Sequence, residues 1–327
     1  MKIRAAIIGM GVGQKHFEAI ENYKGSKVEI ICEKNKKKIN LLKKKYPKKI
    51  FTNNENDIFK DKNINLVSIA SYDDYHYSQI IKSLNSNKNI IVEKPMCLNL
   101  KQLKKIYYLL KKKKNIKITS NLVLRVNSLF KNFKNKINKK NVFYIEADYI
   151  WGRRHKLFGW RSKIKEYSLT LGAGIHMIDL VSWLINLKPI SVHAVGNNKS
   201  TKKTIFKKNS LIVMLFKFPN NILVKISANA GAVHDHFHEI KIFSKDHTLV
   251  NSKMGSYTFK KNNIIKNFSS YPDKKNRKKM IQNFLDILIE KKTKPIITLK
   301  EQFDLMSVCF AVDRSIKLNK TIKIKYL

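Results

Sequence analysis

A glycine-rich segment near the N-terminus has the residue types and spacing of a turn that binds a dinucleotide. Gly9, Gly11 and Gly13 follow a short apolar run and precede a segment with helical spacing. Glycines in such a turn let the backbone approach a pyrophosphate, and free N–H groups at the helix start face the phosphates. The strict pattern would place its third glycine at Gln14. We predict that Gly9, Gly11, Val12 and Gly13 bind the dinucleotide; the alternative is a generic glycine-rich turn.

The second apolar run ends at Glu33, about 20 residues after the turn, where a carboxylate can accept hydrogen bonds from both ribose hydroxyls of a dinucleotide. Such a carboxylate also repels a 2′-phosphate, so Glu33 favours NAD. Lys34 weakens this preference, because a lysine beside the ribose can hold a phosphate, and NADP is not excluded. The alternative for Glu33 is a solvated charge at the end of a strand.

Further motifs follow the turn in a fixed order. Ser71–His76 and Glu93–Pro95 each come directly after an apolar run, so we expect them at the carboxyl edge of a parallel sheet, where ligands bind. The later motifs are Tyr149 with Gly152, Gly159–Arg161 and Gly172–Asp179. In this order and spacing, the motifs resemble the family of glucose–fructose oxidoreductase, inositol dehydrogenase and rhizopine-catabolism proteins (Gfo/Idh/MocA) over nearly the whole chain. Members of that family are NAD(P)-dependent oxidoreductases that act mostly on sugars and cyclitols.

The resemblance implies an α/β fold with two domains. Residues 1–121 would form an NAD(P)-binding Rossmann domain with a doubly wound parallel sheet. Residues 122–327 would form an α+β domain with a large, mostly antiparallel open sheet. This second domain would bind the substrate and mediate a homo-oligomer, either a dimer or a tetramer. The peptide bond between Lys94 and Pro95 is often cis in such proteins.

The resemblance also implies functional residues. Lys94 would exchange the hydroxyl proton as hydride moves to the nicotinamide, and His176 would bind the same hydroxyl or relay its proton. Lysine starts with a pKa of about 10.4, and burial beside a cationic nicotinamide would lower it. The expected cofactor-binding residues beyond Glu33 are Ser71, Tyr72, His76, Glu93 and Lys94. The expected substrate-binding residues are Lys94, Trp160, Arg161, His176 and Asp179.

Three of these substrate-binding residues also have a structural interpretation. Asp179 would share a helix face with His176, so it could orient the imidazole or hold a substrate hydroxyl. The alternative is that Asp179 is a structural carboxylate of the helix. Trp160 is alternatively part of the core. Arg161 is alternatively a surface charge.

One position departs from the family pattern. Many members carry an aspartate four residues before the histidine, where this chain has Gly172. Either Glu166 or Asp179 replaces that aspartate, or the pair of Lys94 and His176 suffices. The departure leaves a second hypothesis open, in which the protein is a cofactor-binding regulator of the same fold without turnover.

Three histidines alternate further along the chain, at His234, His236 and His238. Alternate residues of a strand share a face, so a metal site is conceivable. We expect no metal, and interpret these histidines either as part of the substrate face of the sheet or as incidental surface residues.

The pattern of apolar residues predicts the elements that would position these side chains. Over the first 120 residues, short apolar runs alternate with helical segments, which favours a parallel sheet with helices on both faces. After about residue 122 the runs are closely spaced, with a hairpin turn at 219–221, which favours an antiparallel sheet. Helices at 278–290 and 299–318 would close the chain, whose 327 residues fit two domains.

The composition excludes several classes of protein. The net charge is +44, but only seven of the 67 basic residues are arginine, the residue best suited to bidentate contacts with bases. We therefore expect solvated lysines and no specific nucleic-acid partner. The three cysteines are far apart, which argues against a disulfide framework and a zinc site. Because no apolar run fits a membrane span or a signal peptide, we expect a cytoplasmic protein.

These observations lead to one functional prediction. The protein would be an NAD(P)-dependent dehydrogenase acting on CH–OH groups. It would transfer a hydride between the nicotinamide and a secondary hydroxyl of a sugar, sugar acid, cyclitol or nucleotide-linked sugar. The basic surface weakly favours an anionic substrate.

Overall fold

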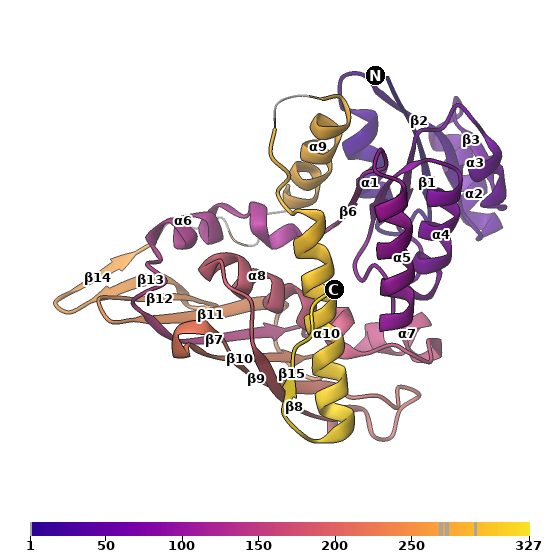
Figure 1. Ribbon diagram of the computed structural model, residues 1–327. Coiled ribbons are helices and arrows are strands. Elements are labelled where there is room, and N and C mark those ends of the chain that lie inside the picture. The colour runs from indigo at the N-terminus through magenta and orange to yellow at the C-terminus, as the bar shows by residue number, and fades with distance from the viewer. Residues whose placement is uncertain (1, 268–270, 272–274, 291–292) are drawn as a thin grey trace. The chain divides into compact units, whose positions relative to one another are not determined.

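The computed structural model describes residues 2–267, 271, 275–290 and 293–327 (Figure 1). The chain forms two compact units. Unit 1 contains the residues up to Val123 and a later segment that ends at Gln302, and unit 2 contains the rest. Residues 275–302 therefore pack in unit 1, although they follow the strands of unit 2 in the sequence.

Unit 1 is a parallel sheet flanked by helices. Its elements are β1 (Ile3–Ile8), α1 (Gly13–Glu21), β2 (Ser26–Cys32), α2 (Lys36–Lys45), β3 (Ile50–Thr52), α3 (Asn56–Lys60), β4 (Leu66–Ile69), α4 (Asp73–Asn85), β5 (Asn89–Val92), α5 (Leu100–Lys112), β6 (Ile118–Ser120) and α9 (Asn276–Leu288). The six strands lie in the order β3-β2-β1-β4-β5-β6, and every pair is parallel. The order reverses between β1 and β4, which is where doubly wound sheets bind their ligands.

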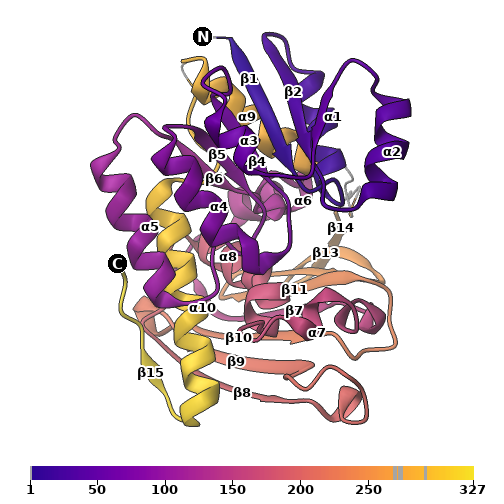
Figure 2. The same cartoon turned by 90° about the vertical axis from the view of Figure 1, so that its right-hand side faces the viewer.

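Unit 2 is built on a nine-stranded sheet. Its elements are η1 (Val123–Val126), α6 (Ser128–Lys136), β7 (Val142–Ile150), η2 (Arg154–Leu157), α7 (Trp160–Lys163), the π-helical turn η3 (Thr170–Gly174), α8 (Ile175–Ile185), β8 (Ser191–Asn197), η4 (Lys199–Thr201), β9 (Leu211–Lys217), η5 (Pro219–Asn221), β10 (Leu223–Asn229), β11 (Phe237–Ser244), β12 (Thr248–Ser252), β13 (Gly255–Lys260), β14 (Asn263–Lys266), α10 (Leu299–Leu318), most of which belongs here, and β15 (Ile322–Lys323). The strand order is β14-β13-β12-β11-β7-β10-β9-β8-β15. All pairs are antiparallel except β10 with β7. Figures 1 and 2 show α6 and α8 on one face of this sheet.

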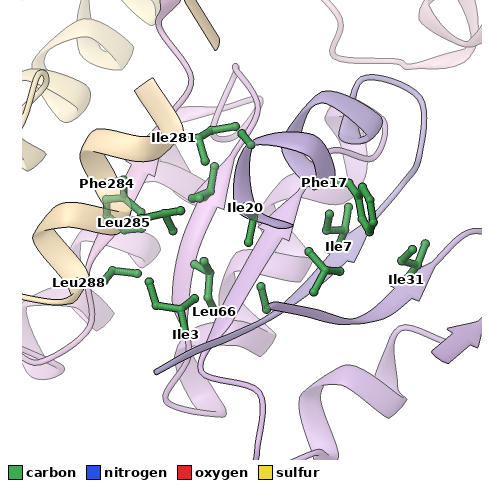
Figure 3. Packing of buried hydrophobic residues seen from close by; sticks show 14 of the residues in the cluster. Ile3, Ile7, Phe17, Ile20, Ile31, Leu66, Ile281, Phe284, Leu285 and Leu288 are labelled. Carbon is green, nitrogen blue, oxygen red and sulfur yellow. The ribbon is translucent and has the colours of Figure 1, made fainter. Parts of the chain in front are cut away.

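The core of unit 1 explains why α9 returns to it. Four apolar side chains of α9 pack against α1 and the parallel sheet (Figure 3). Phe284 and Leu285 are 4% and 0% exposed, and they belong to the same cluster as Ile3 and Ile20. Burial of such side chains stabilises the fold by about 1.5–3 kcal/mol each. The helix therefore completes a hydrophobic core whose other residues all lie within the first 91 positions of the sequence.

The fold class expected from the sequence is confirmed: a doubly wound parallel sheet and a large, mostly antiparallel sheet. Helix α10 has the predicted bounds, and α9 begins and ends two residues before the predicted 278–290. Of the described α-helices and strands, seven were not predicted from the sequence, namely β3, α3, α6, α7, β13, β14 and β15. Of the described helices, none combines the length and apolar character that crossing a membrane would require.

Candidate active site

Each glycine of the turn has its own steric role. Gly9 has φ of +86°, and a Cβ added to it would lie 2.7 Å from the carbonyl oxygen of Ala70. A Cβ at Gly13 would lie 3.2 Å from Cγ2 of Ile7, so this glycine lets α1 pack closely on the sheet. A Cβ at Gly11 would meet no described atom within 4 Å, which leaves space for a ligand. Gly13 thus serves the close packing of helix and strand, although it comes one residue early.

The start of α1 offers donors to phosphate groups. Val12 is the N-cap residue of this nine-residue helix, and no side chain in the described ranges caps it. The first turn also carries no acidic residue. Backbone N–H groups and the positive end of the helix dipole are therefore suited to a pyrophosphate. Together with the open space at Gly11, this start fits a dinucleotide.

Glu33 is held beside the glycine-rich turn. Its Oε2 accepts hydrogen bonds from the Met10 backbone N–H over 3.1 Å and lies 3.0 Å from Nζ of Lys38. Its Oε1 accepts from the Asn35 backbone N–H over 3.2 Å. Burial alone would raise the pKa of Glu33, but the contacts with Lys38 and the two backbone N–H groups outweigh it and lower that pKa. The residue is thus an ionised, fixed acceptor at the end of β2.

The loop after β4 carries the next expected cofactor contacts. Ser71 donates from its hydroxyl to Oε1 of Gln79 over 2.7 Å, and Tyr72 is 53% exposed. Nζ of Lys34, which follows Glu33, lies 3.9 Å from the ring centroid of Tyr75 on α4. These side chains all border the carboxyl ends of β2 and β4.

Lys94 lies at the carboxyl end of β5, half-buried, and its peptide bond with Pro95 is cis, as the resemblance implied. The buried His76 holds this loop in place. Its Nδ1 donates to the carbonyl oxygen of Pro95 over 2.7 Å, and its Nε2 lies 3.2 Å from the carbonyl oxygen of Ser71. His76 therefore joins the loop after β4 to the loop after β5, which contains Lys94.

Glu93 is buried in a polar network that the sequence analysis did not foresee. Its Oε1 accepts hydrogen bonds from His16 over 3.0 Å, Asn121 over 2.8 Å and Arg277 over 3.1 Å. His16 also contacts the hydroxyl of Ser68 over 2.8 Å through Nδ1. Burial alone would raise the pKa of Glu93, but the hydrogen bond from His16 and the charge of Arg277 hold it well below its usual range. These hydrogen bonds hold the side chain of Glu93, the residue that precedes Lys94, in one position.

Of the partners of Glu93, only His16 could have been predicted from the sequence. It lies three residues after Gly13, on the buried side of α1. Arg277 is distant in sequence, and its participation depends on the return of α9.

The second group of predicted residues lies in unit 2, around His176. This histidine occupies the first turn of α8, directly after the π-helical turn η3. Its ring centroid lies 5.8 Å from that of Tyr149 on β7 and 6.0 Å from that of His238 on β11. Turns of π-helix are frequent at functional sites. Here the turn presents His176 to the aromatic face of the sheet.

Asp179 is buried one turn after His176, at 2% exposure, and is paired with Arg125. Nη2 of Arg125 lies 2.7 Å from Oδ1 of Asp179, and its Nε donates to both carboxylate oxygens over 3.1 Å. The two side chains therefore form a buried, hydrogen-bonded ion pair between η1 and α8. This geometry supports the structural interpretation of Asp179.

The alternating histidines lie partly on this same face. Nε2 of His236 is 2.8 Å from the Tyr149 hydroxyl, and the rings of Tyr149 and His238 stack at 4.4 Å. His238 also hydrogen-bonds Tyr271, whereas His234 is exposed. Burial lowers the pKa of His236 to about 4, and lowers that of His238 well below its usual value. Both imidazoles are therefore neutral at pH 7, and the described residues include no group of three or more typical metal ligands.

The departure at Gly172 has a clear structural counterpart. A Cβ added to Gly172 would lie 2.0 Å from the hydroxyl oxygen of Tyr167 and 2.7 Å from its Cζ. The Tyr167 side chain is only 3% exposed. The phenol thus fills the space that a side chain at position 172 would need, and the exposed Glu166 lies next to it in sequence.

Trp160 and Arg161 begin α7, and they contact each other. The Arg161 guanidinium lies 4.1 Å from the Trp160 ring centroid and 5.3 Å from that of the buried Trp151. Unit 2 therefore brings together His176, Tyr149 and two histidines of the β11 segment. Unit 1 brings together the glycine-rich turn, Glu33, Ser71, His76 and the Glu93–Pro95 motif.

Comparisons with known proteins find family models that match both units of the chain. Residues 3–121 match the oxidoreductase family with an NAD-binding Rossmann fold (GFO_IDH_MocA), and residues 141–250 match the GFO/IDH/MocA C-terminal domain. Inositol 2-dehydrogenase of Salmonella paratyphi B is 23% identical over 241 residues, which cover 72% of this chain and 70% of that protein.

Solved structures share the fold along the whole chain. Myo-inositol 2-dehydrogenase of Lactobacillus plantarum has a TM-score of 0.86 at 17% identity, covering 99% of this chain and 100% of its own. Scyllo-inositol dehydrogenase of Lactobacillus casei, solved with NAD(H) and scyllo-inositol, has a TM-score of 0.81 at 17% identity, covering 99% of each chain. With both domain models matched in order, the chain belongs to the Gfo/Idh/MocA family of oxidoreductases with an NAD-binding Rossmann fold.

Proposed function

We propose that this protein is a dehydrogenase of a secondary hydroxyl on a sugar, sugar acid, cyclitol or nucleotide-linked sugar. The observation that carries the proposal is the buried support of the Glu93–Pro95 loop, which holds Lys94 at the carboxyl end of β5. The inositol dehydrogenases among its relatives act on cyclitol hydroxyls, which gives the chemical class.

We assign each of the expected site residues a role in the proposed reaction. When bound, the nicotinamide cofactor accepts or returns the hydride. Lys94 takes the proton of the reacting hydroxyl or gives it back, and His176 donates or accepts a hydrogen bond at the same oxygen. Trp160 and Arg161 would contact the substrate. Asp179 acts less directly, because its pairing with Arg125 fixes α8 one turn below His176.

We infer that NAD is preferred over NADP. The ionised Glu33 would accept hydrogen bonds from the adenosine ribose and repel a 2′-phosphate. Ser71, Tyr72 and the glycine-rich turn would complete the contacts. Lys34 lies over Tyr75, 3.9 Å from the ring centroid, so its ammonium group stays near the same strand end.

The decisive experiment measures NADH formation over a panel of cyclitols, sugars and sugar acids. Wild type is compared with Lys94→Ala and with Lys101→Ala, which removes an exposed lysine of α5. We expect Lys94→Ala to lose at least about 100-fold in kcat, and Lys101→Ala to be unchanged. Equal rates for wild type and Lys94→Ala would remove Lys94 from the mechanism. Tight NADH binding without turnover on any compound would favour the alternative that the protein is a cofactor-binding regulator without catalytic activity. That alternative was raised by Gly172, where many family members have an aspartate.

We propose a homo-oligomer, a dimer or tetramer, formed through the sheet of unit 2. Val195, Leu215 and Leu223 point away from the buried side of β8, β9 and β10 and are 47%, 50% and 44% exposed. Neighbouring strands thus carry exposed apolar side chains on one face. Light scattering at micromolar concentration tests the proposal: Leu215→Lys should shift the mass toward the monomer, and a monomeric wild type would contradict it.

We also propose a cytoplasmic location. The three cysteines are buried and form no disulfide in the described structure, and burial raises the pKa of the Cys32 thiol to about 12. Such thiols fit a reducing compartment. Cell fractionation with a tagged chain would test this location.

A further inference from the structure

Arginine is scarce in this chain, yet three of its seven arginines lie within residues 153–161. This segment follows β7 and contains η2 and α7. Its composition differs from that of the lysine-rich surface elsewhere, so the general bias of the chain toward lysine does not account for it. We refer to Arg153, Lys156 and Arg161 as the basic turn.

The backbone places the basic turn tightly against the segment that leads into β11. Gly152 has φ of +58°, and a Cβ there would lie 1.8 Å from the carbonyl oxygen of His234. Only glycine allows this approach, which brings the next residue, Arg153, toward His236. The proximity has an electrostatic effect, since burial and then the charge of Arg153 lower the pKa of His236.

Arg161 is fixed on the same side of the sheet. Its guanidinium lies over Trp160 and 5.3 Å from the ring centroid of Trp151, and its Nη1 donates to the Lys156 carbonyl oxygen over 3.3 Å. Trp151 is two residues after Tyr149, so the two aromatic side chains share a face. Tyr149 in turn contacts His236 over 2.8 Å and lies 5.8 Å, between ring centroids, from His176. The basic turn therefore borders the face that carries His176.

Among the described residues, none provides a counter-ion for the basic turn. Within the described part of the chain, no carboxylate lies within 4.0 Å of a charged nitrogen of Arg153, Lys156 or Arg161. Burial, Arg153 and Arg161 together lower the pKa of Lys156. Three mutually repelling cations beside neutral rings are an arrangement that an anionic ligand would stabilise.

We propose that the basic turn binds a carboxylate or phosphate group carried by the substrate, next to the hydrogen-bonded pair of Tyr149 and His236. The inference rests on the proposed function for the sugar-like nature of the ligand. It narrows that function to an anionic substrate, a sugar acid or a phosphate-bearing sugar. The planar guanidinium groups of Arg153 and Arg161 suit bidentate contacts with either anion.

Calorimetric titration of the NADH-saturated protein tests this site without requiring turnover. The probes are glucuronate, glucose 6-phosphate and glucose, which share the ring and differ in the anionic group. We expect at least one anionic probe to bind about tenfold or more tightly than glucose. The double variant Arg153→Gln/Arg161→Gln should remove that advantage, measured as the ratio of the affinity for the anionic probe to the affinity for glucose in the same protein. The matched control Lys202→Gln/Lys203→Gln removes the same charge from exposed positions of unit 2 and should bind like wild type.

Each outcome decides the question. Preference for glucuronate alone identifies a carboxylate site, and preference for glucose 6-phosphate alone identifies a phosphate site. The proposal is overturned if wild type binds neither anion more tightly than glucose, a comparison that needs no variant. It is also overturned if both double variants lose affinity equally, or if the arginine variant loses only NADH affinity. If an anionic probe binds tightly but no compound is turned over, the proposed dehydrogenase function is contradicted and the proposed anion site is supported.

Discussion

Glu93 carries its negative charge in a buried site, where it is 7% exposed, and three side chains compensate for that burial. Removing the charge would leave His16 and the partly exposed Arg277 without their anionic acceptor. We predict that Glu93→Gln lowers the free energy of unfolding at pH 7 by on the order of 2–3 kcal/mol. Because the folded pKa of Glu93 is below 4.5, its stabilisation is present above that pH and is lost as the pH falls further.

Urea denaturation between pH 3 and pH 8 measures this effect. The difference between wild type and Glu93→Gln should narrow below pH 4.5. Glu18→Gln is the control, because Glu18 forms an exposed pair with Lys15 and should change stability by less than about 1 kcal/mol. A pH-independent difference at Glu93 would contradict the assignment of an ionised carboxylate.

Gly172 and Tyr167 form a second residue-scale pair. Since the Tyr167 hydroxyl fills the space beside Gly172, we predict that Gly172→Asp destabilises the protein by about 1–3 kcal/mol or more through overpacking. The double variant Gly172→Asp/Tyr167→Ala makes room for the carboxylate and should recover part of that loss. Thermal unfolding of both variants and of Tyr167→Ala gives the coupling free energy between the substitutions at positions 172 and 167. Additive effects of the two substitutions would show that the phenol does not occupy that space.

At the scale of elements, α10 holds the π-helical turn that precedes His176. Asp313 of α10 accepts hydrogen bonds from Thr170 over 2.5 Å and from Ser168 over 2.8 Å. Burial raises the pKa of Asp313 to about 6, although both hydroxyl contacts oppose the rise. The turn is therefore attached to α10 through a carboxyl group that titrates near neutral pH.

Asp313→Asn tests this attachment. The folded state holds the Asp313 proton more tightly than the unfolded state, so wild type should lose stability as the pH rises from about 4 to about 6. Above pH 6 the loss should be constant, and at most about 3 kcal/mol, since part of the side chain reaches solvent. Asp313→Asn should lack this dependence in denaturant titrations. The same pH slope in both proteins would rule the prediction out.

Some helices and strands could be predicted from the sequence, and others could not. Helix α10 is long, and it begins and ends where the sequence predicted, at Leu299 and Leu318. Strand β3 has three residues, and the charged α6 has a weak pattern, so both were missed. Lys94 and His176 were proposed from motifs. The partners of Glu93 were not, because their proximity depends on a helix that returns from the far end of the chain.

At the scale of the whole molecule, unit 1 is assembled from two distant parts of the sequence. The first part supplies the parallel sheet and the glycine-rich turn. The second supplies α9, whose Phe284 and Leu285 enter the core and whose Arg277 reaches Glu93. The stability of the cofactor-binding unit and the support of Lys94 therefore depend on the same helix.

We predict that residues 1–123 alone do not fold into a stable unit, because the core beside Ile3 and Ile20 would be exposed. The same residues joined by a glycine–serine linker to 275–302 should unfold cooperatively and bind NADH. Circular dichroism melts and NADH fluorescence compare the two chains. Phe284→Ala in the joined chain should cost about 3–5 kcal/mol, since a large buried side chain is removed. If residues 1–123 alone melt at the same temperature and bind NADH equally well, α9 is an accessory to unit 1, and Glu93 needs no partner from beyond the sheet.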